Sequence, residues 1–134
     1  MAKITNIEGI GEVYAKKLAD KGINTTEALL EKCASPSGRK TLAAETEISG
    51  QLILKWANRA DLARIKGIGS EYADLLEAGG VDTVPDLARR NADNLYNALV
   101  SANEAKKLVR KVPTENQVAD WIKQAKALPR ALTY

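Results

Sequence analysis

Apolar residues along this chain recur every three to four positions, as they do on one face of an α-helix. Val13, Tyr14, Ala15 and Leu18 form one such stripe, and Gly22 follows it as a helix stop. No stretch alternates apolar and polar residues over the length of a half-buried strand. The pattern therefore predicts an all-α protein.

Capping residues indicate where further helices begin. Thr25 and Thr83 precede apolar stripes and are predicted N-caps, the second with Asp86 at the position of a capping box. The stretch "SPSG" at 35–38 is predicted to be a turn.

Two more helices follow from the same signals. Ser49 is predicted to open a long helix over about residues 50–64. Thr114 and Gln117 form a capping box for a last helix, which Pro129 is expected to end.

The chain contains an internal repeat: residues 7–34 and 65–92 align without gaps and share 11 of 28 residues. "WANRADL" from Trp56 and "WIKQAKAL" from Trp121 extend the similarity. The repeat predicts one compact domain over residues 1–134, built from two helical units, 1–60 and 61–134. The last helix then either covers the first unit's Gly-Ile-Gly turn or faces a partner.

Each unit opens with this Gly-Ile-Gly turn ahead of a helix. Glycine adopts positive φ readily, so successive backbone N–H groups can point outward together. The following helix begins with unpaired N–H donors and a partial positive charge, which favours anions such as phosphate. The candidate donors are the amides of Gly9, Ile10, Gly11 and Glu12 in the first turn and of Gly67, Ile68, Gly69 and Ser70 in the second. The alternative is that the glycines serve only the turn and a close helix contact.

The pattern apolar–x–Gly–apolar–Gly–x–x–x–Ala–x–x–Leu is filled from Ile7 to Leu18 and again from Ile65 to Leu76, and it resembles the helix-hairpin-helix motif. The resemblance implies two short helices joined by a tight hairpin, which in many relatives holds a nucleic-acid phosphate without reading bases. From "IEGIGEVYAKKL" to "WIKQAKALPRALTY" the chain also resembles the bacterial domain-of-unknown-function family numbered 4332. That second resemblance implies paired units of this kind and leaves the activity open.

Acidic side chains surround the first turn. Glu8 and Glu12 bracket it, and a carboxylate about 4 Å from a phosphate costs on the order of 1 kcal/mol even in water. The motif resemblance implies a basic residue two positions beyond the second glycine, where this turn has Val13. The first turn is therefore expected to bind anions poorly.

The second turn is better placed to bind an anion. Arg64 and Lys66 precede its glycines, and Ser70 offers a hydroxyl where the first turn has Glu12. Glu71 and Asp74 in the following helix act against this.

The basic charge is concentrated at the C-terminal end. Residues 61–104 hold four Lys/Arg and eight Asp/Glu, whereas residues 105–134 hold seven and two, in a chain of net charge +3. This asymmetry suggests an oriented contact with an acidic partner. The basic candidates beyond the turn are Lys106, Lys107, Arg110 and Lys111.

Several function classes have little support. The chain has no His, the commonest general base and metal ligand, and a single Cys, so no enzyme, metal site or cofactor is expected. Cys33, Trp56 and Trp121 are expected to be core residues, as are Tyr14 and Tyr72. The chain offers no membrane-spanning apolar run and no signal peptide, so a cytoplasmic location is expected.

Two hypotheses remain for function. The first is sequence-independent binding of DNA or another nucleic acid, weak and salt-dependent, through backbone amides of the glycine turns. The alternative is a protein-interaction or assembly module that keeps the fold and has lost phosphate binding. The oligomeric state is left open.

Overall fold

The computed structural model describes residues 3–7 and 9–134. In this part of the chain all regular structure is helical apart from one isolated bridge between Lys3 and Thr25, which confirms the all-α class. Backbone contacts divide the chain into two compact units, one of Met1–Asp61 with Arg130–Tyr134 and one of Leu62–Pro129.

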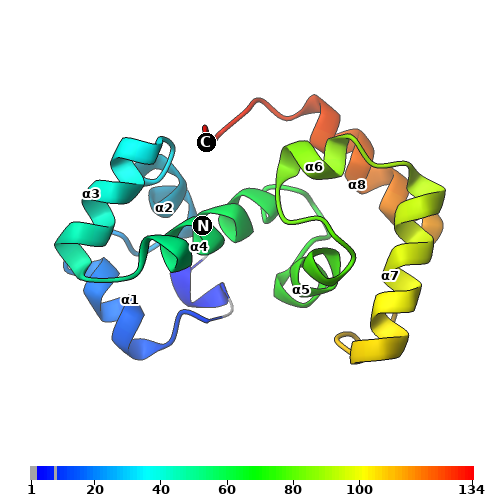
Figure 1. Ribbon diagram of the computed structural model, residues 1–134, viewed down its shortest axis with the longest axis horizontal. Coiled ribbons are helices and arrows are strands. Elements are labelled where there is room, and N and C mark those ends of the chain that lie inside the picture. Colours follow the sequence, from blue (N-terminus) through cyan, green and yellow to red (C-terminus); the bar gives the residue numbers. More distant parts are fainter. Residues whose placement is uncertain (1–2, 8) are drawn as a thin grey trace. The chain divides into compact units, whose positions relative to one another are not determined.

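The helices of both units follow the chain in order (Figure 1). The first unit contains the short 3-10 helix η1 (Ile4–Asn6) and helices α1 (Glu12–Ala19), α2 (Thr26–Lys32), α3 (Pro36–Thr46) and α4 (Gly50–Leu62), the last of which ends at the unit boundary. The second unit contains α5 (Ser70–Ala78), α6 (Val84–Ala88), α7 (Ala92–Lys106) and α8 (Glu115–Ala127).

The first unit has its own core, centred on Trp56 of α4. Tyr14 of α1 packs edge-on against this ring, with centroids 5.1 Å apart. Cys33 is fully buried in the same core, and this burial raises the pKa of its thiol to about 11. These residues are therefore structural, as the sequence predicted.

The last five residues, Arg130–Tyr134, form a C-terminal strap that belongs to the first unit. Leu132 is only 1% exposed and joins the first core, and the backbone amide of Thr133 donates to the carbonyl of Ala34 at 2.8 Å. The sequence placed this segment with residues 61–134. Its lone apolar anchor, Leu132, follows Pro129 outside any periodic pattern, so periodicity gave no sign of this contact.

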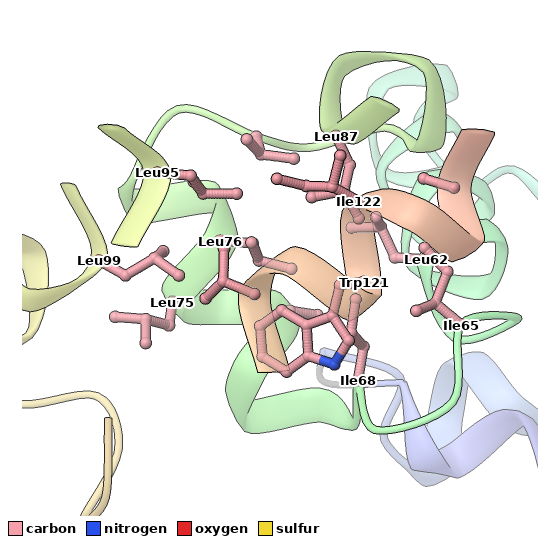
Figure 2. Packing of buried hydrophobic residues seen from close by; sticks show 14 of the residues in the cluster. Leu62, Ile65, Ile68, Leu75, Leu76, Leu87, Leu95, Leu99, Trp121 and Ile122 are labelled. Atoms are coloured by element: carbon pink, nitrogen blue, oxygen red, sulfur yellow. The ribbon is translucent and has the colours of Figure 1, made fainter. Parts of the chain in front are cut away.

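The second core is built from leucines of α5, α6 and α7 around α8. Leu75, Leu76, Leu87 and Leu99 are fully buried. Figure 2 shows Leu76 and Leu87 near Trp121 and Ile122 of α8, whereas Leu75 lies on the side of Leu99. Helix α8 packs against α6 and α7, so its apolar side completes the second unit's core. The sequence left open whether this side covers the first glycine turn or faces a partner. It lies instead in the core of its own unit.

The predicted N-caps form, but one segment that was predicted to be a turn is the start of a helix. Thr25 and Thr83 accept hydrogen bonds from helix amides, and Thr114 forms a full capping box with Gln117. The predicted turn at 35–38 is wrong, because Ser35 caps α3 and Pro36 is its first residue. Ser-Pro is also a helix-start signal, since proline fits the first helical position.

The prediction is also wrong for one residue of the apolar stripe, which does not face the core. Val13 is 70% exposed, although its spacing fits the stripe of α1. Helix α1 is only eight residues long, and Val13 lies in its first turn on the side away from the core.

Candidate functional site

The two glycine turns, Gly9–Gly11 (the first glycine turn) and Gly67–Gly69 (the second glycine turn), share one backbone geometry. Gly9 and Gly67 have φ of 95° and 98°, and Gly11 and Gly69 have ψ of −172° and −171°. The middle isoleucines are buried and belong to the two cores. Their amides donate to the carbonyls three residues earlier, at 3.2 Å in both turns.

The first glycine of each turn is required by the fold. A φ near +95° is costly for any residue with a Cβ atom. A Cβ on Gly67 would also lie 2.9 Å from the indole nitrogen of Trp121, whereas at Gly9 the nearest atom, the Trp56 indole nitrogen, would be 3.4 Å away. Glycine at these two positions therefore needs no ligand to explain it.

The second glycine of each turn is different. Gly11 and Gly69 have φ of −86° and −95°, which any residue adopts, and a Cβ on either would meet nothing within 4 Å. Gly69 is the N-cap of α5, and no side chain caps that helix. Because the first amides of a helix have no acceptor within it, the start of α5 presents N–H donors at an uncrowded surface.

Two of the amides in the second turn region are already used by the protein. The amide of Ile68 donates to the carbonyl of Ile65, and the amide of Lys66 donates to Oε1 of Gln124 at 2.9 Å. Ile68 therefore does not supply an outward donor, contrary to the prediction, and the same holds for Ile10, whose amide donates to Ile7. The remaining candidate amides of the second turn are those of Gly67, Gly69 and Ser70.

Gln124 of α8 bonds to both backbone polar groups of Lys66, which belong to two successive peptide units. Besides accepting from the Lys66 amide, its Nε2 donates to the Lys66 carbonyl at 3.2 Å. The same Nε2 donates to Oδ2 of Asp120 at 2.8 Å, one helical turn earlier. Trp121 lies three residues before Gln124, so one face of α8 supports both Gly67 and Lys66.

The basic segment 106–111 is joined to the start of α5. The hydroxyl of Tyr72, in the first turn of α5, donates to the carbonyl of Lys111 at 3.1 Å. Asn103 of α7 shapes the segment by exchanging two hydrogen bonds with the backbone of Val109. The structure thus brings the Lys111 end of this segment into contact with Tyr72, in the first turn of α5. All four of its predicted basic residues are exposed: Lys106, Lys107, Arg110 and Lys111.

The two basic residues before the second turn are placed differently. The Lys66 side chain is exposed. Arg64 is partly buried, and its Nη2 donates to the carbonyl of Pro129 at 2.7 Å, near the other end of the unit. Arg64 is thus engaged in closing the second unit, a role that the sequence did not indicate.

The surroundings of the first turn carry an acidic and an apolar group instead. Glu12 is exposed at the first position of α1, and Val13 beside it is exposed. Glu8, the other predicted carboxylate, lies outside the described residues. Glu71 is exposed in the first turn of α5, so the second turn also has one acidic neighbour.

Other polar clusters in the described ranges do not add a chemical site. No group of three or more His, Cys, Asp or Glu side chains there could hold a metal ion. Partial burial and a hydrogen bond that the protonated Asp82 carboxyl donates to Asp86 raise the pKa of Asp82, just before α6. No helix within residues 3–7 and 9–134 has the length and apolar character to cross a bilayer.

Comparison with known proteins identifies a family. The model of a family described as Domain of unknown function (DUF4332) matches residues 8–128, so the chain belongs to that family. No curated protein and no solved structure gives a significant match.

Proposed function

We propose that this protein is a non-enzymatic, cytoplasmic nucleic-acid-binding protein that holds backbone phosphates without reading bases. Its two glycine turns act as tandem helix-hairpin-helix elements, of which the second is the working one. The site consists of the start of α5, the side chain of Lys66 and the basic segment 106–111.

The observation that carries this proposal is the geometry of Gly69. Neither its φ nor the space around its Cβ position requires glycine. A larger N-cap residue would have satisfied one amide of α5 with its own side chain, as Thr83 does for α6. The missing side chain instead leaves the helix start accessible to a phosphate oxygen, which its amides and dipole favour.

The exposed basic residues and their contact with α5 also support the assignment of this surface to phosphate binding. The bond from Tyr72 to Lys111 connects the segment of exposed basic residues to the first turn of α5, the turn whose amides we assign to phosphate. Phosphate contacts of this kind give non-specific dissociation constants of roughly 10⁻⁴–10⁻⁶ M that rise steeply with salt.

The second candidate function is a protein-interaction module, and the first glycine turn favours it. Val13 exposes 70% of its surface beside Glu12, at the place where a phosphate-binding turn would carry a cation. An exposed apolar residue next to an acidic one fits a protein contact better than a phosphate.

Fluorescence anisotropy of a labelled duplex and of a labelled single strand, titrated at several salt concentrations, tests the proposal. Lys66→Glu is expected to weaken binding, and Lys66→Gln to reduce the salt slope by about 0.9 for the duplex. Glu12→Lys is expected to strengthen binding by adding a cation at the first turn.

Identical curves for the wild type and all three variants would remove the phosphate role of the turns. A stable complex with a protein, formed without nucleic acid and lost in Val13→Asp, would support the alternative.

A further inference from the structure

Helix α8 fixes the second glycine turn through two neighbouring side chains. Trp121 lies under Gly67, and Gln124 forms a pair of hydrogen bonds with the peptide groups of Lys66. In Figure 2 the indole nitrogen of Trp121 points toward the turn beside Ile68. The turn is thus held by a helix that lies 58 residues further along the chain.

The orientation of the Gln124 amide is fixed by its partners. The Lys66 N–H is a donor and needs Oε1, while the Lys66 carbonyl and the Asp120 carboxylate are acceptors and need Nε2. All three bonds are satisfied by one orientation, so the turn is held in one geometry.

The position that corresponds to Gln124 in the first unit carries a different side chain. The residue three positions after Trp56 in α4 is Arg59, and it is buried. A carboxamide at this position therefore occurs in the unit whose turn we assign to phosphate binding.

We propose that Gln124 is a positioning residue of the phosphate site, an inference that rests on the proposed function. By holding both backbone polar groups of Lys66, it fixes the direction of the Lys66 side chain and the orientation of the amides of Gly67, Gly69 and Ser70. A phosphate then meets a prearranged set of donors and loses less free energy in ordering the loop.

The test compares Gln124→Leu with a control in the same helix, Gln117→Ala. Gln117 completes the capping box of α8 by accepting from the Thr114 amide at 2.8 Å, and it does not touch the turn. Both variants remove hydrogen bonds of α8, so both are expected to lower the melting temperature.

Only Gln124→Leu is expected to weaken duplex binding, by about three- to tenfold, in the anisotropy titration. Its salt slope should equal that of the wild type, because no cation that contacts phosphate is removed. Amide hydrogen exchange at Lys66 should become faster, which reports loss of the clamp directly.

Three results overturn the inference. In the first, Lys66 exchanges faster in Gln124→Leu while the affinity stays within twofold of wild type, and the proposed function survives. In the second, Gln117→Ala weakens binding as much as Gln124→Leu, so the effect is only one of stability. In the third, the wild-type chain shows no salt-dependent binding, and the inference fails together with the proposed function.

Discussion

The two glycine turns have nearly the same backbone and different surroundings. Their dihedral angles agree within a few degrees, and each rests on a tryptophan of the helix that closes its unit. Glu12 and Val13 follow the first turn, and Ser70 and Glu71 follow the second. The backbone is thus the common scaffold, and side chains decide whether it can accept an anion.

The two turns also differ in what supports them. The second has Gln124 on Lys66 and Tyr72 on Lys111, so contacts from distant helices connect it to a basic segment. The first unit receives the C-terminal strap, which inserts Leu132 into its core. The contacts of Gln124 and Tyr72 therefore position the candidate site of the second unit, whereas the strap stabilises the core of the first unit.

The largest expected effect is a difference in stability between alanine substitutions at the first glycines of the two turns. Gly67→Ala combines a φ of +98° with a Cβ only 2.9 Å from Trp121, and should destabilise the second unit by about 3 kcal/mol. Gly9→Ala has the same strain but a looser contact of 3.4 Å, and should cost about 1–2 kcal/mol. Denaturant unfolding monitored by amide hydrogen exchange measures the loss of stability in each unit. Equal losses would show that the tryptophan contacts do not distinguish the turns.

The C-terminal strap gives the next effect. Leu132→Ala removes a side chain that is almost fully buried in the first core, and should destabilise that unit by about 2 kcal/mol. Hydrogen exchange should speed up in α3 and α4 and stay unchanged in α7. The exposed neighbour Thr133→Val is the control, because it keeps the apolar anchor. A uniform loss of protection in both units would contradict the assignment of the strap to the first unit.

The second glycines sharpen the comparison in function. Gly69→Ala should change stability by no more than about 0.5 kcal/mol, because a slightly poorer N-cap is offset by a less flexible unfolded chain. Its methyl group should weaken duplex binding about threefold or more by crowding the amides of α5, while Gly11→Ala should leave binding unchanged. Anisotropy with the purified variants decides this. Equal weakening by both variants would mean that the first turn also binds.

Much of the local structure was predictable from the sequence. The glycine turns, the threonine caps and the buried tryptophans all follow from short-range rules, since each depends on residues within one or two helical turns. Two errors in the predicted helices arise where a local rule is not sufficient. "SPSG" satisfies both the turn rule and the helix-start rule, and Val13 fits a helical period that α1 is too short to bury.

The contacts that define the candidate site could not be predicted in the same way. Gln124 meets Lys66 across 58 residues, and Tyr72 meets Lys111 across 39. Nothing in the local sequence distinguishes Gln124 from any other polar residue on the outer face of α8. Only the packing of Trp121 under the turn brings that position to Lys66, and this depends on the folded core.

The smallest expected effect concerns a carboxyl group that is present in the second unit and replaced by an amide in the first. Asp82 corresponds to Asn24 in the first repeat. Burial, together with a hydrogen bond that the protonated Asp82 carboxyl donates to Asp86, raises the pKa of Asp82 above its ordinary value of 3.8. A raised carboxyl pKa stabilises the fold below the ordinary value, and this contribution is lost as the pH rises through the folded-state pKa. Asp82→Asn should therefore stabilise the second unit at pH 7 by at most about 0.5 kcal/mol, because the pair is largely solvent-screened. The difference from wild type should shrink toward zero below about pH 4, as measured by denaturant midpoints. A stabilisation that persists at acid pH would show that the substituted amide acts through packing and not through the lost charge.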